Sequence, residues 1–308
     1  MKFEPTYTTE FGEMYCGDSL EAMREIPDNS VDLVFTSPPY ALHFKKEYGN
    51  ADQQDYVDWL VPFANEIKRI IKPTGSFILN LGGAWQPGSP TRSLYHYRVV
   101  LKLCDELGFD LAQEFFWFNP AKMPAPAEWV NVRRIRVKDS VEYIFWFVKD
   151  PFVKADNRRV LQEYSPDMRR LIKRGVEETV RPSGHAIKAS FANDHGGSIP
   201  PNLIQIGNNE SNSAYIKGSK AAGTKIHPAR FPAELPRFFI EFLTDPDDLV
   251  LDPFAGSNTT GSVAESLRRR WISIEIREDY ANDSRLRFEE QLELTAPRQA
   301  QPHFSFED

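Results

Sequence analysis

Short apolar runs alternate with longer helical patterns along most of the 308-residue chain, and no other feature constrains the fold as strongly. Apolar runs of about four to eight residues are typical of buried strands, whereas longer amphipathic stretches predict helices. Strands are predicted at 13–16, 31–36, 75–81, 112–118, 141–148, 248–251 and 271–275, and helices at 19–25, 53–72, 97–107, 235–243, 258–269 and 277–292. Seven strands with helices between most of them predict an α/β fold on a parallel sheet.

One stretch, residues 150–225, departs from this alternation. It is richer in Pro, Gly, Ser, Asn and basic residues, and its apolar periodicity is weak. We therefore expect residues 150–225 to form an inserted lobe between two halves of one domain, residues 1–149 and 226–294. Residues 295–308 are expected to be a flexible tail.

The charge is distributed unevenly along the chain. Residues 131–230 carry 18 Lys+Arg and 10 Asp+Glu, a local balance of +8, whereas the remaining residues carry 19 and 34, a balance of −15. A basic middle between acidic flanks is what a DNA-contacting insert on an acidic enzyme body would show. On charge alone, chance clustering on a solvated surface explains the pattern as well.

The composition excludes several classes of protein. No apolar run approaches the roughly 20 residues of a membrane span, and the first residues lack the apolar region of a signal peptide. Two cysteines, Cys16 and Cys104, are too few for a disulfide framework or a zinc site, and the six histidines lack metal-ligand spacing. We therefore expect a cytoplasmic protein without a metal.

The segment VDLVFTSPPY runs from an apolar strand directly into two prolines and an aromatic ring. Pro38 and Pro39 each fix φ and lack an N–H donor, so the backbone is rigid and the carbonyl oxygens near Ser37 stay free to accept hydrogen bonds. Rigid acceptors beside the flat face of Tyr40 suit a planar group that bears an amino group, such as an extruded base. For S-P-P-Y taken alone, a structural proline turn with a packed tyrosine is the simpler interpretation.

A second apolar strand ends at Asp252, and the following turn opens a helix with Asn258 at a capping position. Gly256 lets a ligand approach the backbone of this turn. A further strand ends at Glu275, 19 residues after Gly256, where an acidic side chain can bind ribose hydroxyls. Because Asn258 replaces the second glycine of G-x-G-x-x-G, an adenosine-bearing cofactor is favoured over NAD, and an ordinary strand–helix turn remains the alternative.

Asp18 also follows a predicted strand, where its carboxylate could accept a hydrogen bond from an adenine amino group. The N-cap of the next helix is the simpler role for this side chain. Asp18, Ser37, Asp252 and Glu275 thus all fall at carboxyl ends of predicted parallel strands. In open α/β sheets ligands bind at that edge. The sequence therefore predicts a cofactor site and an amino-recognising site on one rim.

Several motifs together resemble a known family. T-S-P-P-Y at 36–40 resembles motif IV of amino-group DNA methyltransferases, D-P-F-A-G-S-N-T-T-G at 252–261 resembles their motif I, and H-P-A-R-F-P at 227–232 is similar to the motif that precedes motif I. The order, with the catalytic motif first, is that of the circularly permuted beta class. Further stretches resemble the PvuII-type cytosine-N4 modification methylases: KKEYGN at 45–50, WFNPAKMP at 117–124, EWVNVRRIRVKD at 128–139, RPSGH at 181–185 and GGSIPPNL at 196–203.

This resemblance implies a seven-stranded, Rossmann-like fold of the S-adenosylmethionine-dependent methyltransferases, circularly permuted, with a target-recognition lobe at 150–225. It implies a catalytic set of Ser37, Pro38, Pro39 and Tyr40. The side chains that it implies for cofactor binding are Asp18, His227, Phe231, Asp252, Phe254, Gly256, Asn258, Thr259 and Glu275. Asn258 stands where many members of the broad class have glycine.

Within the resemblance, S-P-P-Y implies methyl transfer to N4 of cytosine, and D-P-P-Y implies adenine N6, which stays the alternative. The Ser37 hydroxyl and the Pro38 carbonyl would accept the two amino N–H groups, so that the nitrogen lone pair faces the methyl donor. The target base must be flipped out, with Tyr40 stacked on it. Trp117 or Phe118 could cover the other face, although both suit a core strand as well. Carbon-5 chemistry is excluded, because neither cysteine follows a proline.

DNA contact is predicted for basic side chains in and before the lobe. Arg133, Arg134 and Arg136 would contact phosphates or guanines, with a solvated edge strand as the alternative. Arg181 is a further candidate for base reading, together with Ser183 and His185. The resemblance implies a short palindromic duplex site, a cognate restriction endonuclease that acts on it without a stable complex, and a monomer or weak dimer. An RNA or protein amide methyltransferase and a DNA-binding protein without catalysis are the rival classes.

Overall fold

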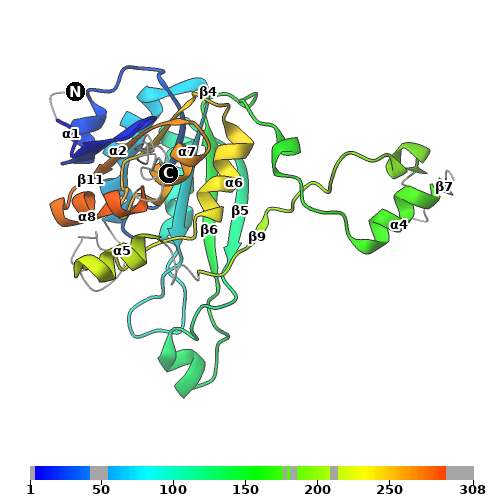
Figure 1. Ribbon diagram of the computed structural model, residues 1–308. Helices are drawn as coiled ribbons and strands as arrows, with labels where there is room; N and C mark the ends of the chain where they lie inside the picture. Colours follow the sequence, from blue (N-terminus) through cyan, green and yellow to red (C-terminus); the bar gives the residue numbers. More distant parts are fainter. Residues whose placement is uncertain (1–3, 42–54, 176–178, 181–185, 209–213, 289–308) are drawn as a thin grey trace, which may run out of the picture.

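The computed structural model describes residues 4–41, 55–175, 179–180, 186–208 and 214–288. Nine strands form one sheet in the order β1-β2-β11-β10-β3-β4-β6-β5-β9, and β7 and β8 form a separate hairpin (Figure 1). The strands are β1 (Tyr7–Thr8), β2 (Gly12–Cys16), β3 (Val31–Thr36), β4 (Ile71–Gly82), β5 (Asp110–Phe118), β6 (Val141–Val148), β7 (Thr179–Val180), β8 (Ala186–Ile187), β9 (Leu203–Gln205), β10 (Leu249–Asp252) and β11 (Arg270–Glu275).

The seven predicted strands are all present, but the sheet is mixed and not parallel as expected. β2, β11, β10, β3 and β4 run parallel to one another, whereas β6 pairs antiparallel with both β4 and β5. The reason lies in residues 119–140, which join β5 to β6 without the crossover that a parallel neighbour requires. The unpredicted edge strands β1 and β9 have only two and three residues, too few to display a period of two.

The predicted helices are present with shifted ends. The helices are α1 (Ser19–Met23), α2 (Tyr56–Ile70), α3 (Tyr95–Leu101), α4 (Pro166–Arg174), α5 (Ala214–Ala222), α6 (Glu234–Leu243), α7 (Thr259–Ser266) and α8 (Glu278–Asp283). A π-helical turn at Lys102–Glu106 extends α3, and a 3-10 turn at Ser284–Arg287 extends α8. Positions 53–54 and 289–292 of the predicted helices lie outside the described residues. None of the helices that the structure describes has the length and apolar character needed to cross a bilayer.

The helices cover both faces of the sheet, and each face has its own core. Side chains of α1, α2 and α3 pack on one face, and side chains of α6, α7 and α8 pack on the other. The central strand β3 contributes to both cores, because Val34 belongs to the first and Leu33 and Phe35 belong to the second. This burial on both faces explains why VDLVF reads as a continuous apolar run and not as an alternating one.

The interval expected as an inserted lobe divides into an arm and two segments that join the body. An isolated antiparallel β-bridge between Gln162 and Ser198 closes the base of the arm. The arm carries α4 and the β7–β8 pair and extends away from the sheet (Figure 1). After the arm, β9 pairs with β5 and α5 packs beside the Ser284–Arg287 turn. The projecting part is therefore shorter than 150–225, since β9 and α5 belong to the body. Arg181 and residues 295–308 lie outside the described residues.

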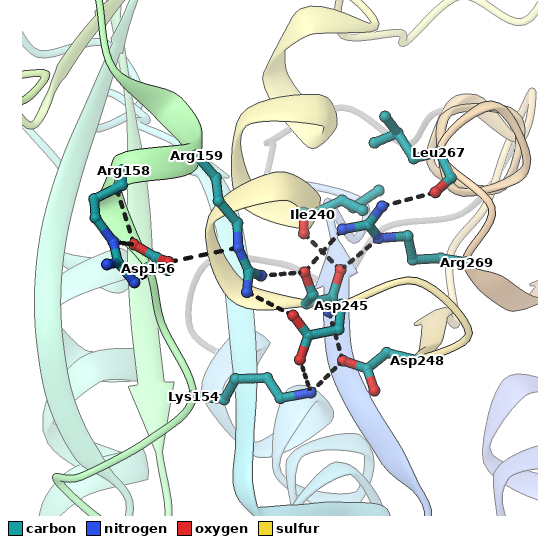
Figure 2. A network of polar contacts seen from close by, with 10 residues as sticks. Lys154, Asp156, Arg158, Arg159, Ile240, Asp245, Asp248, Leu267 and Arg269 are labelled. Atoms are coloured by element: carbon teal, nitrogen blue, oxygen red, sulfur yellow. Dashed lines mark hydrogen bonds and ion pairs between the residues drawn. The ribbon is translucent and has the colours of Figure 1, made fainter. Parts of the chain in front are cut away.

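A polar network fixes the root of the arm (Figure 2). Lys154 Nζ lies 2.8 Å from a carboxylate oxygen of Asp245 and 2.6 Å from one of Asp248. Arg159 donates to the Thr244 carbonyl at 2.7 Å and to Asp245 at 2.5 Å. These contacts tie the segment after β6 to the turn between α6 and β10. Single exposed ion pairs contribute little, but a network on fixed backbone restricts the direction in which the arm leaves the body.

Candidate active site

A cavity of about 700 Å³ lies where the parallel strands β2, β3, β10 and β11 end. The predicted site residues in its lining are Asp18, Ser37, Pro38, Pro39, Tyr40, His227, Phe231, Phe254, Gly256, Thr259 and Glu275. Further lining comes from aromatic and polar side chains that the sequence did not single out, Trp59, Phe63, Asn80, Asn119, Lys122, Glu142, Asn208 and Arg230. The structure therefore brings together, in one cavity, loops that lie about two hundred residues apart in sequence.

The loop after β3 is held rigidly against the sheet. The buried Thr36 hydroxyl donates to Asp252 Oδ1 at 2.7 Å, which fixes the end of β3 beside β10. Pro38 is buried, and the Tyr40 ring lies against Gly82 of β4, where an added Cβ would come within 2.4 Å of the ring. Glycine at position 82 is thus required for the Tyr40 ring to reach its place in the cavity wall.

A chain of polar groups surrounds Ser37. The Ser37 hydroxyl donates to the Tyr40 hydroxyl at 3.1 Å, which donates to Glu142 Oε2 at 2.7 Å. Asn80 Nδ2 lies 3.1 Å from the Tyr40 hydroxyl, and Lys122 Nζ donates to Glu142 Oε1 at 3.1 Å. Burial and the neighbouring Glu142 carboxylate raise the pKa of Tyr40 well above its usual value. The Tyr40 hydroxyl is therefore a neutral group held by three partners, Ser37, Asn80 and Glu142.

Asn80, Lys122 and Glu142 were missed by the sequence reasoning. Asn80 and Glu142 lie within strands β4 and β6, whose apolar runs FILNL and VEYIFWFV draw attention to the core. A polar side chain inside a buried run is itself a signal, because burying it costs free energy unless it is hydrogen-bonded. Lys122 lies on the loop after β5 and carries no comparable signal.

The loop after β10 is closed by Glu275 from the end of β11. Glu275 Oε2 accepts a hydrogen bond from the Gly256 N–H at 2.8 Å, and its Oε1 accepts one from the Arg277 N–H at 3.0 Å. Gly256 has a φ of 53°, and a Cβ there would come 3.1 Å from the His227 ring. Burial raises the pKa of Glu275 above its usual value and lowers that of His227 to about 4. Glycine at 256 therefore permits both the turn and the close approach of His227.

Asp252, expected to contact a cofactor, lies behind the cavity wall instead. Its two carboxylate oxygens accept hydrogen bonds from the hydroxyls of Thr36 and Thr260, each at 2.7 Å, and Oδ1 also accepts one from the Phe254 N–H. Burial raises the pKa of Asp252 to about 6. The geometry gives this carboxylate a structural role, because it holds the strand end, the turn and the first turn of α7 together.

Asn258 likewise shapes the loop and does not reach the cavity. It is fully buried at the N-cap of α7, with a left-handed φ of 56°. Its side-chain oxygen accepts from the Gly261 N–H at 3.0 Å and from the Ser273 hydroxyl at 2.7 Å, and its amide donates to the Tyr7 hydroxyl at 3.0 Å. Asparagine tolerates this conformation better than most residues, which explains how it can stand at a position where glycine is common.

Asp18 occupies the helix N-cap that the sequence favoured, and it also lines the cavity. Asp18 Oδ1 accepts hydrogen bonds from the Leu20 N–H at 2.8 Å and the Glu21 N–H at 3.1 Å. The opposite wall is aromatic, since Phe254 packs against Trp59 and Phe63 with ring centroids 5.8 and 5.0 Å apart. Polar groups at one side and an apolar wall at the other suit a ligand with a flat ring and a polar end.

A family model described as DNA methylase matches residues 31–285. The chain belongs to this DNA methylase family. It is 54% identical over 288 residues to the type II methyltransferase M.PvuII of Proteus hauseri, covering 92% of this chain and 86% of that protein. It is also 28% identical to M.BglII of Bacillus subtilis, over 88% of this chain and 67% of that one. Among solved structures it is similar to a PvuII DNA methyltransferase (cytosine-N4-specific), with a TM-score of 0.77, 48% identity, and coverage of 93% and 89%.

Of the two aromatic side chains of the methylase that were candidates to cover a base, one reaches the cavity. Trp117 lines it, while its indole N–H donates to the Ile206 carbonyl at 2.9 Å and its ring packs in the core. Phe118 is not part of the lining. Trp117 therefore combines the core role and the cavity role that the sequence could not separate.

Three of the four predicted DNA-contacting arginines lie on the loop between β5 and β6. Arg133, Arg134 and Arg136 are all exposed, and they follow a short helical turn at Glu128–Val132 instead of an edge strand. Arg133 donates to Glu128 at 2.7 Å, and Arg136 donates to the Pro90 carbonyl at 3.0 Å. The same loop contributes Asn119 and Lys122 to the cavity, whereas these three arginines of the methylase are not part of its lining.

Asp252 gives the stability of the methylase a pH dependence of definite sign. Burial sets the pKa of Asp252 to about 6 in the folded state, above its ordinary value of 3.8, so the native state keeps a proton that the unfolded chain releases. Stability must therefore fall as pH rises between these values, by about 3 kcal/mol in all. Asp252→Asn removes this titration, so the difference in unfolding free energy between wild type and variant should change by about that amount between pH ~4 and pH ~6.5. Urea unfolding across this range measures it, and a constant difference would contradict the assignment.

Proposed function

We propose that this methylase transfers the methyl group of S-adenosylmethionine to N4 of cytosine in a short duplex DNA site, as the modification enzyme of a type II restriction–modification system. The observation that carries the proposal is the single cavity in which the Ser37–Tyr40 loop faces the loop closed by Gly256 and Glu275. The 54% identity to M.PvuII, and the similarity to a solved methyltransferase that is specific for cytosine N4, support the reaction type.

The cavity fits S-adenosylmethionine by its donors and its shape. Glu275 would accept hydrogen bonds from ribose hydroxyls, since each of its oxygens already takes one backbone N–H and keeps further lone pairs. The aromatic wall around Phe254 would receive the adenine ring, and Asp18 would face the polar end of the cofactor. When bound, the cofactor supplies an electrophilic methyl group on a sulfonium.

The other end of the cavity suits an extruded cytosine. The Ser37 hydroxyl oxygen and the Pro38 carbonyl would accept the two N–H groups of the amino nitrogen, which turns its lone pair toward the methyl donor. Tyr40 and Trp117 supply flat apolar surface beside the same place. A base inside the duplex cannot reach this cavity, so the target must be flipped out, at a cost of a few kcal/mol that these contacts offset.

The order of elements supports a circularly permuted domain with an inserted recognition lobe. The strand that carries the catalytic loop, β3, precedes β10, which carries the cofactor loop, although the two strands are neighbours in the sheet. The arm that carries α4 and the β7–β8 pair extends away from the body (Figure 1). The recognition lobe would read the bases of the target site, with Arg181, Ser183 and His185 as the candidate side chains. Residues 1–149 and 226–294 would form the two halves of the catalytic domain.

The same proposal implies the partners of the enzyme. Duplex DNA is the substrate, and a cognate endonuclease would cut the same unmodified site without forming a stable complex with the methylase. A monomer or weak dimer suffices, because one cavity with one arm contains all the parts proposed for the reaction. Modification of cellular DNA fits a cytoplasmic enzyme.

The direct test of the function identifies the modified base. Purified protein is incubated with duplex DNA and S-adenosylmethionine, the DNA is digested to nucleosides, and the products are separated by mass spectrometry. N4-methylcytosine is the expected product. N6-methyladenine would replace the proposal by the alternative amino-group specificity, and methylation of RNA or protein but not DNA would overturn it.

Cofactor binding should depend on the Glu275 carboxylate. Glu275→Ala removes a charge-assisted acceptor and should weaken S-adenosylmethionine binding by about 1.5–3 kcal/mol in a calorimetric titration. Glu278→Ala on α8, which removes a nearby carboxylate outside the cavity lining, is the matched control and should bind as the wild type does. Equal affinities for the Glu275 variant and the wild type would exclude a direct contact.

DNA affinity should depend on the exposed arginines of the loop between β5 and β6. Reversing Arg133 and Arg134 to Glu should weaken duplex binding and flatten the dependence of log Kd on log salt, with cofactor affinity unchanged. Arg270→Glu is the control, because Arg270 begins β11 at the opposite edge of the sheet from Glu275. Fluorescence anisotropy at several salt concentrations measures both effects. An unaltered salt slope would show that the two arginines do not touch phosphate.

A further inference from the structure

The hydrogen bonds that link Ser37, Tyr40 and Glu142 all run in one direction, from Ser37 to the Glu142 carboxylate. The Ser37 hydroxyl donates to the Tyr40 oxygen at 3.1 Å, and the Tyr40 hydroxyl donates to Glu142 Oε2 at 2.7 Å. Asn80 Nδ2 lies 3.1 Å from the Tyr40 hydroxyl and 3.4 Å from Ser37 Oγ, so it holds both oxygens in line. Both hydroxyl protons in the chain point toward the carboxylate, which leaves a lone pair of Ser37 free to accept a hydrogen bond from a ligand in the cavity.

Glu142 is placed to end such a chain. Lys122 Nζ donates to one oxygen, Oε1, at 3.1 Å, whereas Oε2 accepts from the Tyr40 hydroxyl at 2.7 Å and lies 3.5 Å from Asn80 Nδ2. The Glu142 side chain is 17% exposed and that of Lys122 is 32% exposed, so the pair connects the buried hydroxyls with solvent. The titratable groups near Glu142 are Tyr40, Lys122 and Tyr95, the last from α3.

Methylation of an exocyclic amino group must release a proton. When the nitrogen lone pair forms a bond to the methyl carbon, the carbon–sulfur bond breaks with its electron pair on sulfur, and the nitrogen is left with one proton too many. Asp252 lies behind the cavity wall with its oxygens taken by threonine hydroxyls, and Glu275 and Asp18 accept hydrogen bonds from backbone N–H groups. The Ser37 chain is therefore the path that begins at the amino nitrogen.

We propose that Ser37, Tyr40 and Glu142 form a proton relay that carries the released amino proton to the Glu142 carboxylate, an inference that rests on the proposed function. The proton passes from nitrogen to Ser37 Oγ, the Ser37 proton passes to Tyr40, and the Tyr40 proton passes to Glu142 Oε2. Both hydroxyls end neutral, the methylated base is neutral, and protonated Glu142 returns its proton to water beside Lys122. Glu142 acts through the two hydroxyls and does not touch the base.

Two variants interrupt the proton relay while keeping side chains of nearly the same size in the site. Glu142→Gln keeps a hydrogen-bond acceptor of the same size for Tyr40 but removes its basicity, and Tyr40→Phe keeps the ring and removes the middle hydroxyl. A positioned proton acceptor typically contributes 10²–10⁴-fold, so each variant should slow single-turnover methyl transfer by about 100-fold. Because both act on one path, the double variant should be no slower than the slower single one. Glu114→Gln, an exposed carboxylate on the neighbouring strand β5, should be as fast as the wild type.

The measurement is the rate of methyl transfer to a duplex pre-bound to excess enzyme, at saturating S-adenosylmethionine, with melting temperature and cofactor affinity recorded for every variant. Chemical rescue separates a relay from a structural role. In Glu142→Ala, added formate should restore part of the lost rate by taking the place of the carboxylate beside Lys122. A Glu142→Gln rate within twofold of wild type, losses that multiply in the double variant, or an absence of formate rescue in a folded protein would each overturn the relay. A wild type that forms no N4-methylcytosine would instead overturn the proposed function.

Discussion

The parallel pairing of β3 with β10 is the contact on which the site depends. Val250 and Leu251 of β10 lie opposite Leu33 and Val34 of β3, although more than two hundred residues separate the strands. The Thr36–Asp252 hydrogen bond closes this pair at its carboxyl end. Because parallel neighbours end at one edge, the loops that follow must lie side by side. A one-residue slip would turn Thr36 away from Asp252 and separate the two halves of the cavity.

The cavity is built on buried polar groups that are paired, and this pairing explains its rigidity. Asp252 has two hydroxyl donors, Glu275 has two backbone donors, and Asn258 joins the loop to β11 and to Tyr7. Removing any one partner leaves a buried group unsatisfied, which costs more than the hydrogen bond itself contributes. The Ser37–Tyr40–Glu142 chain follows the same rule, but its last member reaches solvent through Lys122. The contacts that hold the cavity in shape and the contacts proposed to carry the amino proton are therefore both side-chain hydrogen bonds.

Much of the site was predictable because strand ends can be read from apolar runs. Ser37, Gly256 and Glu275 each follow such a run, and the carboxyl edge of a parallel sheet must gather them. Asp252 also follows a run, but whether its carboxylate faces a ligand or the threonine hydroxyls depends on side-chain packing across two strands. Glu142 was not predictable, since it reaches Tyr40 only because β6 turns back antiparallel next to β4. An interval such as 150–225 could be recognised as irregular, yet nothing local indicated that β9 would return to the sheet.

The sequence by itself determined the seven strands, the loops that carry S-P-P-Y and D-P-F-A-G-S-N, and the family to which these motifs belong. Local patterns suffice for these features, because burial, proline geometry and glycine turns act within a few residues. Only the tertiary structure decided which polar side chains touch the cavity, which ones support its wall, and how the arm leaves the body. The Lys122–Glu142–Tyr40 contacts join three separate segments, and such contacts depend on strand order and register, which no short stretch of sequence encodes.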